Sequence, residues 1–159
     1  MSNPRKYHRA EALERLRRFC AYQERYVAEC KNKLYTWGYY GLEADEMINE
    51  LYAENFIDEG RFAEAFVRGK FFHKYWGRQR ILYELKQRKI SAYNIKKGMA
   101  EITDDDYAKA ILHLYEKKKK EYSGKGLKAY QLEIKTKNFI VQKGFEYNVV
   151  NDVIERGEV

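Results

Sequence analysis

Apolar residues recur along most of the chain at spacings of three and four, the periodicity of an α-helix that buries one face. A single proline and ten glycines leave this pattern almost uninterrupted, and the content of Leu, Lys, Glu, Ala and Arg suits helix better than sheet. We therefore expect an all-α protein. The pattern predicts helices over about residues 8–22, 24–37, 44–54, 58–75, 78–88, 91–102, 103–120, 127–144 and 149–154.

Local signals support several of these boundaries. Asp58 and Ser91 each stand at the start of a predicted helix with a side-chain oxygen that can accept from a free backbone N–H, and residues 103–106 form an acidic cap for the next helix. Gly38 and Asn55 follow predicted helices and tolerate the left-handed backbone that ends many of them. The predicted helices are therefore separated by short turns.

The stretch 55–70 reads NFIDEGRFAEAFVRGK and carries the clearest amphipathic pattern. Phe62, Ala65 and Phe66 fall on one helix face, which we expect to be buried. The basic residues that lie largely off this face are Arg61, Arg68 and Lys70.

One arrangement recurs three times: the end of a helix, a short turn, and a short apolar helix, over residues 34–51, 85–102 and 140–154. Such self-similarity is typical of supersecondary units that stack because none buries its apolar face alone. We expect three tandem three-helix repeats stacked into an elongated curved array. The expected repeats are residues 8–56, 57–102 and 103–157.

The charge balance favours an anionic partner, although it also fits simple solubility. Lys and Arg number 31 against 24 Asp and Glu, a formal net charge of +7, and such an excess favours phosphate neutralisation with counterion release. Cys20 and Cys30 lack metal or redox spacing, so we expect free thiols in a reducing compartment. Because neither a membrane-spanning run nor a signal peptide is visible, we expect a cytoplasmic protein without membrane contact. We also expect a monomer.

The sequence contains no recognisable catalytic or metal-binding pattern. The histidines are far apart in the sequence, and the Gly-Lys-Gly at 124–126 lacks the upstream glycine and the following Ser or Thr of a phosphate loop. Three aspartates at 104–106 fit a helix cap better than a cation site. We therefore expect a non-enzyme with no catalytic residue, cofactor or metal.

Basic residues between 61 and 89 are interleaved with aromatic residues, a mixture that suits phosphate contact with base stacking. A plainer interpretation is that Phe66, Phe72 and Trp76 pack a junction between repeats and the charges are solvated. A second basic patch covers residues 117–128, beside two glycines. The candidate contacts are Arg61, Arg68, Lys70, Lys74, Arg78, Arg80, Lys117, Lys118, Lys119, Lys120, Lys125 and Lys128.

The stretch 55–70 resembles the signature of the RecX family, in which a hydrophobic residue, Ile or Leu, Asp, and Asp or Glu precede x-Arg-Phe-Ala. Further matches continue the family pattern in order: Phe66-Val67-Arg68, Gly77, Arg80, Ile81, Glu84-Leu85 and Arg88-Lys89-Ile90. The resemblance covers residues 9–156 and is strongest over 47–90. It implies the same three-repeat architecture.

Two positions depart from the family pattern. Lys89 stands where glycine is usual, so a left-handed turn there costs about 1 kcal/mol or takes another geometry. Near Tyr26 the family commonly has a capping serine, whereas this chain offers Gln23 and Glu24, which leaves the start of the second helix open.

The resemblance implies a regulator that binds the RecA filament on single-stranded DNA and inhibits RecA ATPase and strand exchange. It does not say whether DNA is contacted directly or through RecA. Two alternatives stay open: a nucleic-acid-binding module acting without a recombinase, and a helical adaptor for some other acidic protein.

Overall fold

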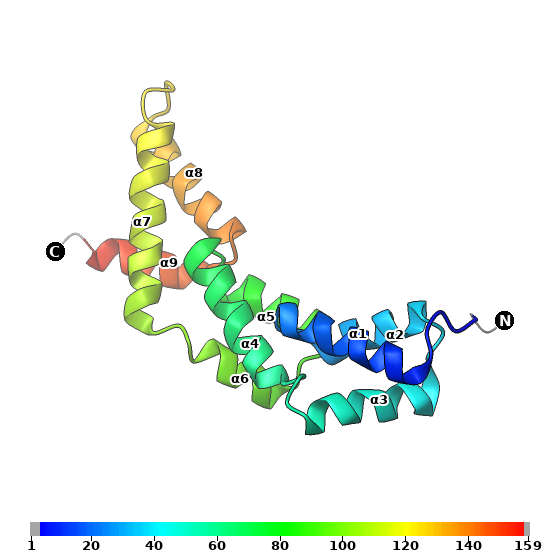
Figure 1. Ribbon diagram of the computed structural model, residues 1–159. Helices are drawn as coiled ribbons and strands as arrows, with labels where there is room; N and C mark the ends of the chain where they lie inside the picture. Colours follow the sequence, from blue (N-terminus) through cyan, green and yellow to red (C-terminus); the bar gives the residue numbers. More distant parts are fainter. Residues whose placement is uncertain (1–3, 158–159) are drawn as a thin grey trace. The chain divides into compact units, whose positions relative to one another are not determined.

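The computed structural model describes residues 4–157, and all secondary structure in that range is helical, which confirms the all-α prediction (Figure 1). None of the helices in the described range is long and apolar enough to cross a membrane. The elements are α1 (Arg9–Tyr22), α2 (Val27–Thr36), α3 (Gly41–Ala53), α4 (Glu59–Arg68), η1 (Gly69–His73), α5 (Arg78–Gln87), α6 (Ala92–Met99), α7 (Asp104–Tyr122), α8 (Ala129–Gln142) and α9 (Tyr147–Arg156).

Backbone contacts divide the described chain into two compact units. Unit 1 takes residues 4–65 and 86–98, and unit 2 takes residues 66–85 and 99–157. The boundary falls inside α4, so residues of the predicted middle repeat, 57–102, are shared between the units. The division into three repeats therefore stays a prediction.

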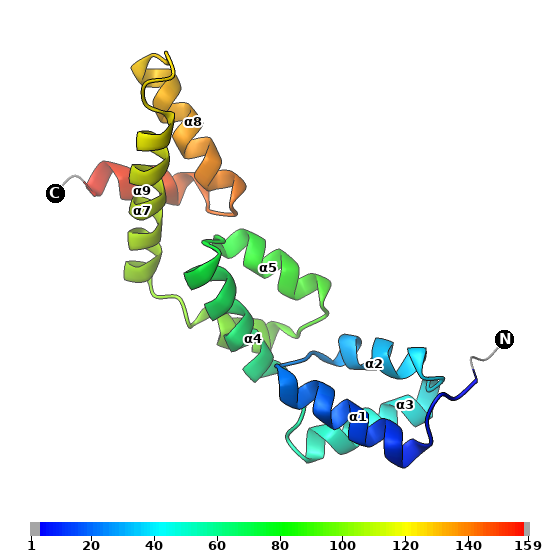
Figure 2. The same cartoon turned by 45° about the horizontal axis from the view of Figure 1, so that its top comes forward.

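In unit 1, α1, α2 and α3 lie side by side around an apolar core (Figure 2). Leu16, Leu34 and Met47 contribute one fully buried side chain from each of these helices. The free thiols of Cys20 and Cys30 are also buried there, with their sulfurs 3.7 Å apart. Nothing in the spacing of the two cysteines indicates this proximity.

Two helix starts in unit 1 differ from the prediction. The second helix begins at Val27 rather than at residue 24, because the Val27 N–H donates to the carboxylate of Glu59, 3.1 Å away. That partner is distant in sequence, so local capping signals do not reveal it. The third helix begins at Gly41 rather than at Ala44, with Gly41 at a positive φ of 62°.

The helix predicted over 58–75 is shorter and less regular than expected. Asp58 accepts from the N–H of Arg61 at 3.0 Å, as predicted for a capping residue. Regular α-helix ends at Arg68, and a π-helical turn follows and runs to His73. The buried face is also shifted, because Ala63 and Val67 are fully buried whereas Ala65 is only half-buried.

Unit 2 is built on the pair α7 and α8, with α9 packed against both (Figure 1). The buried ring of Tyr107 stacks between Phe71, 5.9 Å away, and Phe145, 4.9 Å away. Its hydroxyl donates to Glu146 at 2.6 Å and accepts from the backbone N–H of Arg78 at 3.0 Å. Burial first, and then the Glu146 hydrogen bond, raise the pKa of Tyr107.

Candidate functional site

A close backbone contact in unit 2 joins the start of α5 to the turn between α8 and α9. The Gly77 N–H donates to the carbonyl of Lys143 at 2.8 Å, and the Gln79 N–H donates to the carbonyl of Gly144 at 3.0 Å. A Cβ on Gly77 would lie 2.2 Å from the carbonyl carbon of Gly144, whose own φ is +103°. Both glycines are therefore needed to bring these segments together.

This contact gathers positive charge around one lysine. The Lys143 ammonium donates to the carbonyl of Lys74 at 2.7 Å, and the charges of Arg80, Lys117 and Lys118 also act on it. We call these five residues the Lys143 cluster. They come from the segment after η1, from α5, from α7 and from the end of α8, so the tertiary fold assembles them.

The cluster carries an electrostatic cost. Burial first, and then repulsion from Arg80, Lys118, Lys117 and Lys74, lower the pKa of Lys143. Lysine charges held this close stabilise a bound anion, because the anion relieves repulsion that the protein otherwise bears alone. The arrangement is suited to phosphates or carboxylates.

An aromatic ring borders the cluster. The Arg80 guanidinium lies 3.8 Å from the ring centroid of Trp76, and the Lys70 ammonium lies 4.7 Å from the same centroid. Trp76 also packs edge-on against Phe66, and it is half-buried. The predicted mixture of basic and aromatic side chains is therefore present here, with Lys70 joined to Arg80 through one indole ring.

Three of the predicted contact arginines have acidic partners within the protein. Arg61 donates to Glu24 at 2.6 Å, which is the largest cause of its raised pKa. The remaining ion pairs join Arg68 to Glu101 at 3.2 Å and Arg78 to Asp104 at 3.0 Å. The positive charges of these three arginines are therefore largely neutralised by carboxylates of the same chain.

The predicted patch over 117–128 separates into two parts. Lys117 and Lys118 belong to the Lys143 cluster, although Lys118 also pairs with Glu121 at 2.9 Å. Around the connection between α7 and α8, Lys125 lies 5.9 Å from the ring centroid of Tyr122, and the backbone N–H of Lys128 donates to Gln131. Lys119 lies 5.3 Å from the ring centroid of Tyr115, and Lys120 is exposed.

Lys143 was missed by the sequence reasoning. It lies beside Gly144 at the end of a predicted helix, where a basic residue is ordinary helix-end chemistry. No local signal indicates that residue 143 meets residue 74. Its role is visible only once the Gly77 and Gly144 backbones are in contact.

The acidic run at 104–106 lies in the first turn of α7, where Thr103 accepts from the Asp106 N–H at 3.0 Å. This geometry is that of a helix cap. Within residues 4–157, no group of three or more His, Cys, Asp or Glu side chains could hold a metal ion.

Comparison with known proteins adds to these observations. A family model described as "RecX, second three-helix domain" matches residues 58–99. The "Regulatory protein RecX" of Clostridium botulinum is 27% identical over 127 residues, covering 80% of this chain and 59% of that protein. The protein of the same name from Geobacillus thermodenitrificans is 27% identical over 139 residues, covering 87% of this chain and 51% of its own length.

The chain is thus similar to RecX proteins over most of its length, and it matches the RecX family model over residues 58–99. Its fold agrees, since the crystal structure of RecX from Lactobacillus salivarius matches with a TM-score of 0.82 and 23% identity, covering 92% of this chain and 94% of that one. The chain spans a little over half the length of the two curated RecX relatives. The activity and partners of those longer proteins can therefore only be proposed for this chain.

Proposed function

We propose that the chain is a RecX-type regulator that binds the RecA filament on single-stranded DNA and inhibits RecA ATPase and strand exchange. The role is regulatory and non-catalytic, in keeping with the name "Regulatory protein RecX" borne by its relatives. We propose further that it acts as a monomer in the cytoplasm.

The single observation that best supports anion contact is the Lys143 cluster with Trp76 beside it. Clustered ammonium groups neutralise phosphates or acidic side chains, and an indole next to Arg80 supplies an apolar face. A nucleoprotein filament presents phosphates and acidic protein surface together, so it fits this arrangement better than either partner alone.

Under this proposal the predicted contacts differ in weight. Arg80, Lys74, Lys117 and Lys143 act as anion contacts, with Lys70 contributing beside Trp76. Arg61 and Arg78 act mainly in the fold, because their guanidinium groups are engaged by Glu24 and Asp104. The lysines at 119, 120, 125 and 128 form the edge of the surface.

The test reverses charge in the cluster without touching the apolar core. A triple variant, Lys74→Glu, Arg80→Glu and Lys117→Glu, is compared with a control, Lys86→Glu and Lys96→Glu, which alters exposed lysines of unit 1. We expect the triple variant to lose inhibition of RecA-dependent ATP hydrolysis by about tenfold or more, and the control to keep it. Circular dichroism checks that both stay helical.

Co-sedimentation separates this proposal from its alternative, a module that binds nucleic acid without RecA. The chain is mixed with RecA filaments on single-stranded DNA, with the DNA alone, and with RecA alone. Strong pelleting with the filament and weak pelleting with either part supports the filament proposal. Equal pelleting with bare DNA and with filament would favour the alternative. Full inhibition by the triple variant would show that the Lys143 cluster does not make the contact.

A further inference from the structure

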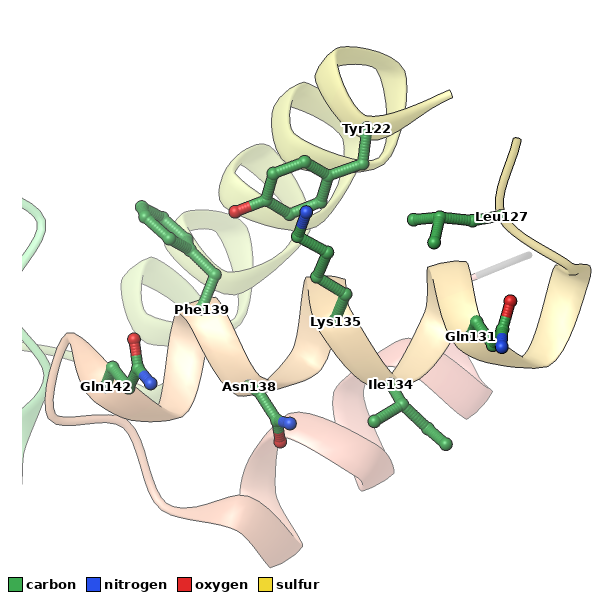
Figure 3. A pocket seen from close by; sticks show the side chains of 8 residues that line it. All are labelled: Tyr122, Leu127, Gln131, Ile134, Lys135, Asn138, Phe139 and Gln142. Carbon is green, nitrogen blue, oxygen red and sulfur yellow. The ribbon is translucent and has the colours of Figure 1, made fainter. Parts of the chain in front are cut away.

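A hollow of about 510 Å³ opens between α7 and α8, and Lys74, Arg80, Lys117 and Lys143 are not among the residues that line it (Figure 3). Its apolar lining includes Leu127 and Ile134, which are 37% and 55% exposed, together with Phe139 and the ring of Tyr122. Figure 3 shows Lys135 and Phe139 extending from α8 toward Tyr122 of α7. Exposed aliphatic groups beside aromatic rings leave apolar surface that a partner could bury.

The surroundings of this hollow are cationic. The Lys135 ammonium lies 4.4 Å from the ring centroid of Tyr122, and the Lys125 ammonium lies 5.9 Å from it. The Lys118 ammonium lies 4.2 Å from the ring centroid of Phe139. Among residues 4–157, neither Lys125 nor Lys135 has a carboxylate within ion-pair distance, although the charge of Lys125 also acts on Glu121. Both ammonium groups can therefore approach an acidic partner.

Side-chain amides complete the lining. Gln131 and Asn138 lie on the same face of α8 as Ile134 and Lys135, at helical spacing. An amide offers both a donor and an acceptor, which is what an extended peptide backbone requires along its edge. The hollow thus combines apolar contact, positive charge and backbone-type hydrogen bonding.

The ring geometry separates two classes of occupant. A nucleobase would stack on a face of Tyr122 or Phe139, where it competes with the ammonium groups of Lys135 and Lys118 for the ring surface. The aliphatic groups of Leu127 and Ile134 favour burial of an apolar side chain. Carboxylates pair with the lysines without displacing anything.

We propose that the hollow between α7 and α8 is a docking site for an acidic peptide segment of a protein partner, anchored by an apolar side chain. Leucine or a similar residue enters between Leu127, Ile134 and Phe139. Acidic neighbours on the segment pair with Lys125 and Lys135. This goes beyond the filament proposal, because it concerns the hollow beside the Lys143 cluster and its test does not depend on ATPase inhibition.

The experiment measures fluorescence anisotropy of a fluorescein-labelled peptide in which glutamates flank two leucines, titrated with the intact chain. Two matched peptides replace the leucines by serine or the glutamates by glutamine. We expect each replacement to weaken binding about tenfold, since both the anchor and the charges contribute. Amide resonances that shift in a ¹⁵N spectrum should lie in residues 122–142.

Variants then identify the surface. Ile134→Glu and Lys135→Glu should each weaken the leucine-containing peptide about tenfold. The matched controls Leu42→Glu, at an 82% exposed position, and Lys96→Glu should bind like the unmodified chain. If Ile134→Glu loses helical circular dichroism, Lys135→Glu decides the matter alone, because its side chain lies at the solvent-exposed rim.

The proposal is wrong if the leucine-containing peptide does not bind, if its serine counterpart binds equally well, or if Lys135→Glu has no effect. It is also overturned if an oligothymidylate binds more tightly and shifts the resonances of residues 122–142.

Discussion

Basic residues serve opposite purposes in the α1–α3 region and in the Lys143 cluster. Between residues 5 and 25 every arginine has a carboxylate partner, among them Arg17 with Glu54 at 2.8 Å and Arg25 with Glu29 at 3.1 Å. In the Lys143 cluster the charges that lower the pKa of Lys143 are positive, although Lys118 also pairs with Glu121. Net charge is thus a poor guide to function, because only charge left without an internal counterpart is free to bind an anion.

The largest effect is expected from the backbone contact that assembles the cluster. In Gly77→Ala the added Cβ meets the backbone at Gly144, with no flexible side chain to yield, and we expect a loss of about 3 kcal/mol or more in the free energy of unfolding. Urea denaturation measures it. The control Gly69→Ala adds a Cβ where nothing lies within 4 Å, so it should not destabilise. Equal losses in both variants would contradict this account.

A second pair of variants tests the comparison directly. Arg61→Ala removes the hydrogen bonds to Glu24 and to the Asn55 carbonyl. We expect the free energy of unfolding to fall by about 1 kcal/mol, and not by more, because the Arg61 side chain is partly exposed to solvent. Filament binding should be unchanged. Arg80→Ala should do the reverse, with weaker filament binding and nearly unchanged stability. Urea denaturation and co-sedimentation with the filament are measured on both variants. If both lost stability and filament binding alike, the distinction between a structural Arg61 and an anion-binding Arg80 would be wrong.

Lys89 offers a smaller test. It adopts a left-handed φ of 60°, the first of the two geometries considered for this position, where the family usually has glycine. Lys89→Gly should therefore stabilise the chain by up to about 1 kcal/mol, less the entropy cost of glycine in the unfolded chain. Because Lys89 is outside the Lys143 cluster, inhibition of RecA should not change. A loss of inhibition would mean that the surface extends to this lysine.

The smallest expected effect is on pH dependence. Since the pKa of Lys143 is lowered in the folded protein, the unfolded chain binds more protons in the alkaline range between the folded and unfolded pKa. The free energy of unfolding should therefore rise as pH increases through that range. Below it Lys143 is charged in the folded protein, and the destabilisation caused by burial and repulsion is fully present. Lys143→Gln should remove this contribution, as seen by urea denaturation over an alkaline pH series. A bound oligonucleotide should raise the pKa of Lys143, measured by NMR of its side chain.

Much of the local structure is readable from the chain. The capping roles of Asp58 and Ser91 are confirmed by backbone N–H donors at 3.0 and 3.2 Å, and within the cap predicted at 103–106 it is Thr103 that accepts, at 3.0 Å. These features are readable because a cap and its donor are close in sequence. Asn55 is left-handed with a φ of 64°, as its tolerance predicts. The start of α2 is different in kind, because Glu59 reaches it from another element.

The site is divided in the same way. Sequence alone marked Lys74, Arg80, Lys117 and Lys118 as basic and exposed, along with Arg61 and Arg78, and it could not rank them. Ranking needs the counterions, and those of Arg61 and Arg78 are fixed by tertiary contacts. Whether the ranked residues contact a filament stays a prediction.

The amino-acid pattern by itself determined that this chain is helical, where most of its helices lie, and that it carries excess positive charge. These properties follow from periodicity, capping and composition, which act over a few residues. Only the tertiary structure decided which charges meet. The contact of Gly77 with Gly144 brings Lys143 to Lys74 and Arg80, because electrostatic interaction depends on distance in space and not on separation along the chain.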